Sequence, residues 1–578
     1  MKATIRLLLI GLLLLALGVV LTHCGQAPAP SSAPLLTAPP LASTDTISRS
    51  LHATYTVKGL VSDADGPVAG ATVRVRATDN KTATASDGSF TLSGLIATSP
   101  VSVTAWAEGY FVGWVSAVPG AEPVTITLSP YYTTDNPDYT WFSIEGAEGS
   151  KSCGHCMPAY AEWQADAHSQ SAINLRFLTM YNGTDVAGNQ SPATRYGYSR
   201  DYGRFPLRPD PTQPYYGPGY KLDFPDTAGN CAACHVPVAA AKPGGAYIAD
   251  PNRLSPIEAD GIFCEFCHKI GDVRLDPVTG LPYPNMPGVL SIRLYRPEEG
   301  QQLFFGNFDD VTRRVSYLPL EEESAFCAPC HFGVFWDTLV YNSFGEWLES
   351  PYSDPETGQT CQDCHMPIAG YDYFVFPEKG GLIRDPNRIF SHLMPGAADV
   401  ELLQNAVTLT TTARLEGDTV VVQVNITNDK TGHHVPTDSP LRHLILLVQA
   451  RDEQERVLPL QNGPSIPEWA GVGDPQRGYY AGLPGKIFAR VLEELWTEVA
   501  PTGAYWNPTR VLSDNRLAAF TTDTSLYTFA APDEGATTVE VRLLFRRAFI
   551  ELMDQKGWDV PDITMAQQSL IVGGEKPR

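Results

Sequence analysis

The chain carries the segment Cys231-Ala-Ala-Cys234-His235 near its middle, and three further segments repeat its spacing. The repeats are Cys264-Glu-Phe-Cys267-His268, Cys327-Ala-Pro-Cys330-His331 and Cys361-Gln-Asp-Cys364-His365. Two thiols three residues apart form thioethers to the two vinyl groups of one haem, and the next histidine presents an imidazole nitrogen to its iron. The spacing therefore predicts four covalently attached haems c. Their proximal iron ligands are expected to be His235, His268, His331 and His365.

The remaining cysteines leave no ordinary disulfide framework. Of eleven cysteines, eight lie in the four repeats, two lie in Cys153-Gly-His-Cys156-Met157, and the last is Cys24. The fifth pair has Met157 where the others have histidine. We favour a fifth haem with Met157 as axial ligand, since methionine sulfur binds haem iron. Two alternatives stay open: a degenerate site that holds only a disulfide, and a thiol-exchange site.

The N-terminus is typical of an exported protein. Lys2 and Arg6 precede an apolar run from Leu7 to Leu21, which is short for a bilayer-spanning helix. We expect residues 1–23 to be a signal peptide. The segment ending at Cys24 resembles the lipobox of bacterial lipoproteins, although His23 stands where a small residue is preferred. This resemblance implies that Cys24 is lipidated. The lipid would anchor the protein to the outer face of the cytoplasmic membrane or to an outer membrane, on the periplasmic or cell-surface side. Secretion without lipid and an uncleaved anchor are the alternatives.

Composition bounds the fold and the partners. A chain of 578 residues is long enough for several domains. The net charge of −23 argues against nucleic acid as a partner and favours cationic redox proteins or small soluble electron donors and acceptors. Solubility alone would also explain this charge.

Hydrophobic patterns divide the chain into five regions. Residues 24–50 are rich in Pro, Ala, Ser and Thr and predict a disordered linker. Alternating apolar residues predict a small antiparallel β-sandwich over 51–130 and a larger β-sandwich with inserted helices over 401–578. Between them, residues 131–400 are expected to form a multihaem cytochrome domain of short helices and loops around the haems. The expected fold class is therefore multidomain, with the cytochrome domain flanked by two β-sandwiches.

Two parts of the chain resemble known families. Gly59-Leu-Val-Ser-Asp63, the segment 66–73, Ser86-Asp-Gly-Ser-Phe90 and Ala107-Glu-Gly-Tyr110 resemble the carboxypeptidase regulatory-like domain. That resemblance implies a transthyretin-type β fold and says almost nothing about function.

A second set of segments lies between about Cys153 and Arg442: Ala159–Trp163, Ala167-His168-Ser169, Glu346–Tyr352, Ser391-His392 and Gly432–Thr437. With these segments the chain resembles exported multihaem cytochromes of the tetrahaem cytochrome c and octahaem oxidoreductase superfamily. This resemblance implies that His168, His392 and His433 are distal haem ligands. The neighbouring His434 and His443 are weaker candidates.

The expected function is electron transfer by four or five haems c, without catalytic residues. The alternative is a multihaem oxidoreductase that acts on a small nitrogen or sulfur compound such as nitrite or hydroxylamine. It would need one iron with an open coordination position.

Overall fold

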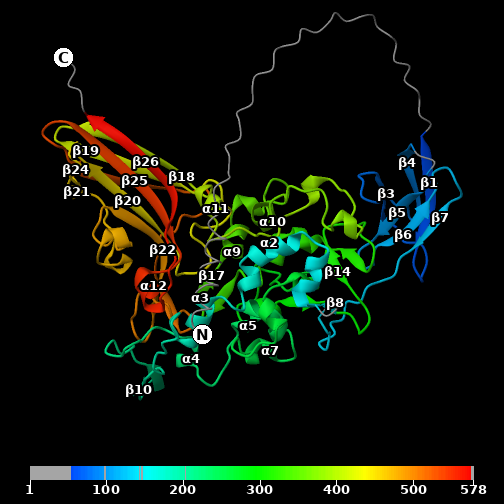
Figure 1. The fold of residues 1–578 in the computed structure, drawn as a ribbon, viewed down its shortest axis with the longest axis horizontal. Coiled ribbons are helices and arrows are strands. Elements are labelled where there is room, and N and C mark those ends of the chain that lie inside the picture. Colours follow the sequence, from blue (N-terminus) through cyan, green and yellow to red (C-terminus); the bar gives the residue numbers. More distant parts are fainter. Residues whose placement is uncertain (1–53, 97–98, 142, 145–146, 202, 574–578) are drawn as a thin grey trace, which may run out of the picture. The chain divides into compact units, whose positions relative to one another are not determined.

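The computed structural model describes residues 54–96, 99–141, 143–144, 147–201 and 203–573 (Figure 1). The predicted signal peptide, the linker and Cys24 lie outside the described residues. The described residues form one compact unit by their contacts. Within the described part, no helix has the length and apolar character needed to cross a bilayer.

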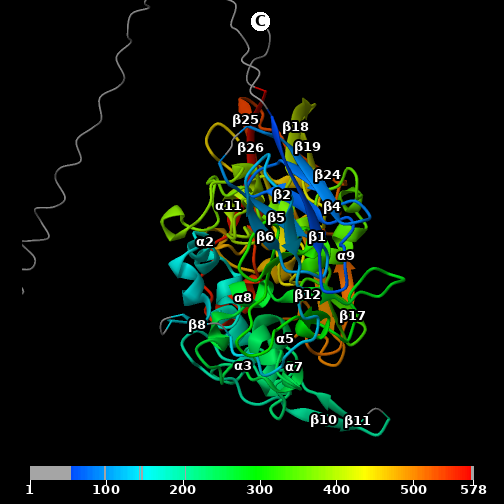
Figure 2. The same ribbon diagram turned by 90° about the vertical axis from the view of Figure 1, so that its right-hand side faces the viewer.

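The N-terminal β domain consists of two small sheets around one apolar core (Figure 2). One sheet has the order β4-β1-β7 and the other β3-β2-β5-β6. The strands are β1 (Tyr55–Ser62), β2 (Thr72–Val75), β3 (Lys81–Ala83), β4 (Ser89–Leu95), β5 (Val101–Trp106), β6 (Gly113–Ala117) and β7 (Val124–Thr127). The expected all-antiparallel pairing is wrong in one place, because β7 pairs parallel to β1.

Buried contacts join this domain to the middle of the chain. Arg74 Nη2 lies 2.8 Å from Asp309 Oδ2, with both side chains largely buried. The Trp106 indole donates to Ser316 Oγ over 3.1 Å. Buried ion pairs of this kind resist separation, because removing one partner leaves the other charge buried and unpaired.

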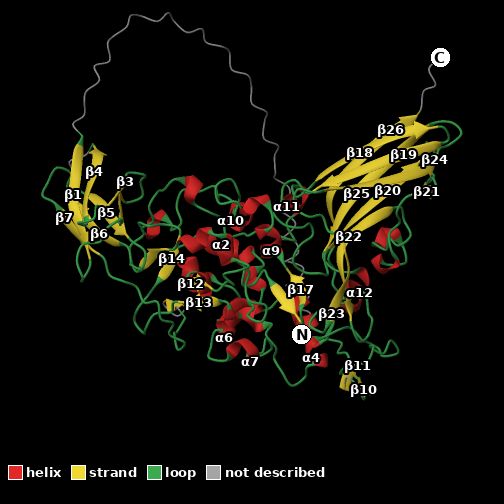
Figure 3. Cartoon of the chain, turned by 180° about the vertical axis from the view of Figure 1, so that it is seen from behind, coloured by secondary structure: helices red, strands yellow, loops and turns green. Residues whose placement is uncertain are grey.

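The middle of the chain combines short helices with two-stranded ladders (Figure 3). The helices are α2 (Ala159–Ala165), α3 (Leu175–Asn182), α4 (Tyr220–Asp223), α5 (Ala232–His235), α6 (Pro237–Ala240), α7 (Gly245–Ile248), α8 (Cys264–Cys267), α9 (Ser343–Leu348), α10 (Cys361–His365) and α11 (Val400–Gln404). The ladders pair β8 (Ser143–Ile144) with β9 (Ala147–Glu148), β10 (Tyr196–Ser199) with β11 (Gly203–Pro206), β12 (Ile270–Val273) with β13 (Ile292–Leu294), β14 (Phe304–Gly306) with β15 (Val315–Tyr317), and β16 (Gly333–Phe335) with β17 (Thr338–Tyr341).

The C-terminal region has two larger sheets that share one apolar core (Figure 1). Their orders are β18-β19-β24-β21 and β23-β22-β20-β25-β26. The strands are β18 (Thr408–Glu416), β19 (Thr419–Thr427), β20 (His443–Arg451), β21 (Leu460–Asn462), β22 (Gly485–Glu494), β23 (Thr509–Asp514), β24 (Thr522–Ala530), β25 (Ala536–Arg546) and β26 (Ile563–Gly573), with helix α12 (Ile550–Lys556) between the last two. Buried and half-buried residues alternate along β19, as expected for a strand with one face in a core.

The expected fold class is wrong. We expected a cytochrome domain of helices and loops wrapped around haems and flanked by two sandwiches, but the described chain is mostly β-structure in several sheets, with few and short helices. Three attachment motifs give about one turn of helix each, for example Cys264–Cys267 in α8, and Cys327–Cys330 forms a turn. Such a turn buries too little surface to build a helical domain, and in the middle of the chain the short helices alternate with two-stranded ladders.

Candidate haem-attachment centre

The attachment motifs share one local conformation. The backbone N–H of His235 donates to the carbonyl of Cys231 over 3.0 Å, and His268 and His331 make the same bond to the first cysteine of their motifs. Met157 does so to Cys153 over 3.1 Å. This turn brings the first thiol and the residue after the second thiol to the same side. The segment at Cys153 therefore shares this backbone bond with the repeats at Cys231, Cys264 and Cys327, with Met157 in the place of the histidine.

Thiols of different motifs meet in space. Hydrogen bonds join Cys153 to Cys264, Cys234 to Cys330, and Cys327 to Cys361. The last contact lowers the pKa of Cys361 to about 7. All ten described cysteines are free thiols, so this structure holds no disulfide between Cys153 and Cys156. The motifs are thus neighbours, although they are spread over much of the sequence.

Three pairs of histidines face each other. The ring centroids of His168 and His331 lie 6.4 Å apart, as do those of His392 and His268, and those of His433 and His365 lie 6.3 Å apart. Two imidazoles on opposite sides of one metal ion, each with a nitrogen about 2 Å from it, have ring centres about 6 Å apart. The spacing therefore fits one haem iron between each pair. The three residues expected as distal ligands each lie opposite a motif histidine, and their role as ligands stays a prediction.

Hydrogen bonds orient these rings. The Nδ1–H groups of His268 and His365 each donate over 2.7 Å to a backbone carbonyl, those of Phe305 and Pro395. His433 donates in the same way to the His434 carbonyl over 2.9 Å. A carbonyl only accepts, so the proton lies on Nδ1 and leaves the Nε2 lone pair for a metal. Burial lowers the pKa of His433 and favours the neutral ring that binds a metal.

Two of the paired rings have a carboxylate near Nδ1: His168, and His268, whose Nδ1 lies 3.4 Å from Glu321 Oε1. The Nδ1 of His168 lies 2.7 Å from the buried carboxylate oxygen Oδ2 of Asp166. Opposite His168, His331 Nδ1 lies 4.0 Å from Asp438 Oδ2. A carboxylate makes an imidazole a stronger electron donor to a metal than a carbonyl does. Both rings of the pair of His168 and His331 have a carboxylate on the Nδ1 side.

The other described histidines have different neighbours. His434 Nδ1 lies 3.5 Å from Glu346 Oε2. His443 packs against Trp469 and Phe549, with centroids 5.4 and 5.8 Å away, and burial lowers its pKa to about 3. His155 Nε2 lies 3.3 Å from Lys379 Nζ. None of the three faces a motif histidine.

Among the described histidines, none faces His235. Its ring stacks on Phe177 with centroids 3.9 Å apart, and its Nδ1–H donates to the Ser171 carbonyl over 3.1 Å. Two half-buried phenols, Tyr341 and Tyr505, hydrogen-bond to each other near this motif and interact electrostatically with Cys231. Burial raises the pKa of Tyr505 to about 12, so it stays protonated at neutral pH.

Sequence reasoning missed Phe177, Tyr341 and Tyr505. They come from helix α3, strand β17 and the loop before β23. None belongs to a motif with a fixed spacing. Only the high content of tyrosine hinted at phenols near the haems.

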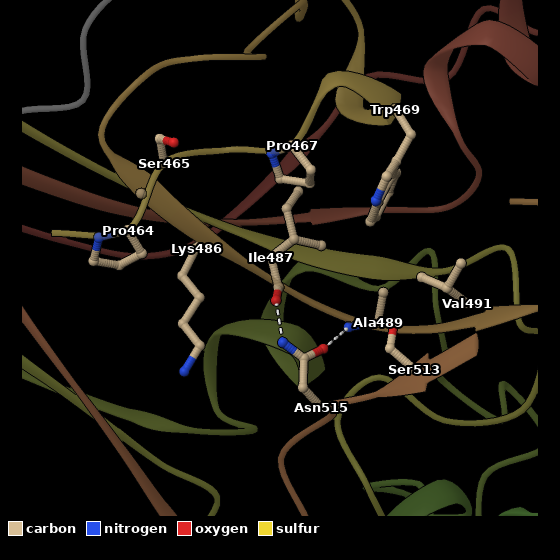
Figure 4. A pocket seen from close by; sticks show the side chains of 11 residues that line it. Pro464, Ser465, Pro467, Trp469, Lys486, Ile487, Ala489, Val491, Ser513 and Asn515 are labelled. Atoms are coloured by element: carbon tan, nitrogen blue, oxygen red, sulfur yellow. Dashed lines mark hydrogen bonds between the residues drawn. The ribbon is translucent and has the colours of Figure 1, made fainter. Parts of the chain in front are cut away.

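A separate cavity of about 220 Å³ lies in the C-terminal sheets (Figure 4). The side-chain amide of Asn515, which lines this cavity, is hydrogen-bonded to the backbone. Its Nδ2 donates to the Ile487 carbonyl over 2.7 Å, and its Oδ1 accepts from the Ala489 N–H over 2.9 Å. The walls are otherwise mainly apolar. This cavity brings together no ligands for haem.

Comparison with known proteins covers two parts of the chain. The carboxypeptidase regulatory-like domain family matches residues 56–129, which confirms the expected family for that region. No curated protein matches the chain. Among solved structures, the chain is similar to the penta-haem cytochrome c552 from Thermochromatium tepidum, with 18% identity, a TM-score of 0.49 and coverage of 73% of this chain and 98% of that one.

Two further solved structures are similar to 30% of the chain. The ASH/PapD-like domain of human CEP192 has 7% identity, a TM-score of 0.14 and 89% of its own chain covered. AvmM, which catalyses macrocyclization in alchivemycin A biosynthesis, has 10% identity, a TM-score of 0.15 and 92% covered. The N-terminal β domain is thus a carboxypeptidase regulatory-like domain, and the larger part of the chain has a penta-haem cytochrome c as a distant structural neighbour.

Proposed function

We propose that this protein is an exported electron-transfer protein that carries haem c at its four Cys-x-x-Cys-His motifs and a fifth haem at Cys153 and Cys156. The observation that carries this proposal is the set of three facing histidine pairs with centroid spacings of 6.3 to 6.4 Å. An iron with two imidazole ligands has no open position for a substrate, so it exchanges electrons only.

The arrangement of the motifs supports electron transfer between haems. A thiol contact joins the motif at Cys153 to the motif at Cys264. The motif Cys327–His331 contacts two others, because Cys330 bonds to Cys234 and Cys327 bonds to Cys361. Haems attached there would be close neighbours, which favours rapid electron exchange. The chain positions them, orients their ligands and tunes their potentials through burial and charge.

Electron paramagnetic resonance of the oxidised holoprotein tests this proposal. We expect low-spin signals from the three irons between histidine pairs. Bound haem is counted on the same sample from the pyridine haemochrome spectrum. A protein without covalent haem, or one whose irons are all high-spin, would contradict the proposal.

We also propose attachment to a membrane through lipid on Cys24, with cationic proteins or small soluble molecules as redox partners. The lipobox-like segment and the net charge of −23 support these two points. Labelled palmitate should be incorporated into the expressed chain and not into the Cys24→Ser variant. Equal labelling of the two chains would rule out this anchor.

His235 favours a second candidate function, an oxidoreductase acting on a small nitrogen or sulfur compound. Since no described histidine faces His235, a haem there would have an open position beside the phenols of Tyr341 and Tyr505. These phenols could donate hydrogen bonds to a bound ligand. Cyanide added to the oxidised holoprotein should then change the spectrum of one haem. If the spectrum stays unchanged at saturating cyanide, electron transfer alone remains.

A further inference from the structure

We propose that a surface cavity between helix α3 and the loop after helix α12 binds a small oxyanion from solution through Arg176 and Arg547. The cavity has a volume of about 420 Å³ and is lined by residues 170, 173–176, 186, 547 and 557–560. This site goes beyond the proposed electron transfer and does not depend on it.

The cavity is open to solvent and has apolar walls. Ile173, Leu175 and Val186 at its edge are 47%, 61% and 46% exposed, while Trp558 is buried. A site of this shape excludes part of the water around a ligand and strengthens its contacts with nearby charges. The two arginines are the cationic groups among the lining residues.

Neither arginine has a carboxylate partner. Within the described part of the chain, no ion pair involves Arg176 or Arg547, and Arg547 Nε is buried without a hydrogen-bond partner. Burial and neighbouring arginine charges, with Arg442 among them, lower the pKa of both residues. Arg442 lies outside the cavity and is paired with Asp438, whereas Arg176 and Arg547 line the cavity and repel each other. An anion bound between these two would relieve that repulsion.

The chemistry of the arginines indicates the class of ligand. A guanidinium group is planar and donates two parallel hydrogen bonds to the oxygens of a carboxylate, sulfate or phosphate. Helix α3 begins at the cavity with Asn174 as its N-cap, so the positive end of its dipole adds to the potential there. In a chain with a net charge of −23, this local excess of positive charge stands out.

Two other groups could form ion pairs with the arginines. The first is Asp559, which lines the same cavity, although it forms no ion pair with either arginine within 4.0 Å. The second is a propionate of a haem attached at Cys231. Ser171 and Phe177, which are adjacent in sequence to residues that line the cavity, contact His235. The exposed rim favours a ligand from solution over either of these.

Calorimetric titration of the holoprotein with inorganic phosphate and with sulfate, in chloride-free buffer of low ionic strength, tests the site. We expect one saturable site whose affinity falls at least tenfold in the Arg176→Gln/Arg547→Gln variant. Arg414→Gln is the matched control, because Arg414 is an exposed arginine on β18 paired with Glu416. Asp559→Asn should strengthen binding, since it removes a competing carboxylate.

Three results would overturn the proposal. The first is that neither phosphate nor sulfate binds at a saturable site. The second is that the double variant and the Arg414→Gln control bind the probe equally. The third is a changed haem potential in the double variant together with no phosphate binding by the parent, which would assign the arginines to a haem propionate. If the double variant does not fold, Arg547→Lys keeps the charge, loses the paired donors and should still weaken binding. Haem content and spin state of the same samples report separately on electron transfer.

Discussion

The imidazole rings of His365 and His433 lie with centroids 6.3 Å apart and planes 16° from parallel. His365 ends helix α10, whereas His433 follows strand β19 of a C-terminal sheet. Both rings donate from Nδ1 to a backbone carbonyl, so both Nε2 atoms remain available. The C-terminal sheets therefore supply a side chain to the attachment centre and are not a separate module.

Replacing His433 by alanine should convert one haem from low-spin to high-spin, because its iron loses the distal imidazole. The high-spin signal in electron paramagnetic resonance measures this change. His434→Gln is the control, since His434 contacts Glu346 instead of a motif histidine. The same high-spin signal in both variants, or in neither, would contradict the assignment of His433.

Asp166→Asn should raise the midpoint potential of one haem. The Asp166 carboxylate accepts from His168 Nδ1, and an amide would make that imidazole a weaker donor and so stabilise ferric iron less. We expect a shift of about 30 to 60 mV, since about 59 mV corresponds to a tenfold change for one electron. Spectroelectrochemical titration measures it. Asp201→Asn, at an exposed carboxylate, should leave all potentials in place, and a downward shift in Asp166→Asn would refute this role.

Glu346→Gln should destabilise the fold at neutral pH by about 3 to 5 kcal/mol, since it leaves the buried Arg516 without part of its countercharge. Burial opposes ionisation of Glu346, but His434, Arg516 and Thr437 outweigh burial and lower its pKa to about 2. A carboxyl whose folded pKa is depressed stabilises above its unfolded pKa, and this contribution disappears as pH falls through the folded value.

Thermal unfolding of both proteins from pH 7 to pH 2 measures that contribution. The difference in stability between parent and Glu346→Gln should be constant above about pH 5, shrink below the ordinary glutamate pKa of about 4.3 and be small near pH 2. A difference that does not depend on pH would mean that the carboxylate charge is not responsible.

Intact mass spectrometry should find five haems on the parent chain and four on the Cys153→Ser/Cys156→Ser variant. The reason is that Met157 makes the same backbone bond to Cys153 as the histidines of three motifs make to their first cysteines. His155→Gln keeps both thiols and should retain five haems. Four haems on the parent would remove the fifth site and leave Met157 without an axial role.

The attachment sites could be predicted from sequence because their chemistry is local. Two thiols and a histidine on one turn define a site whatever surrounds it, as at Cys264 and His268. The fold class could not be predicted from the sequence, because the helical turns at these motifs are too short to show which regular structure surrounds them. Residues 270–341 form ladders such as β12–β13 and β16–β17 from runs of three or four residues. Runs of that length carry no clear period.

The sequence by itself determined where haem can be attached and, through resemblance, which histidines to expect opposite the motifs. Only the tertiary structure decided the pairs, because His168, His392 and His433 meet His331, His268 and His365 by long-range packing that local spacing does not encode. It also left His235 facing no described histidine and brought Arg176, Arg442 and Arg547 together. Covalent chemistry acts over a few residues, whereas ligand pairing and charge clustering depend on how distant segments pack.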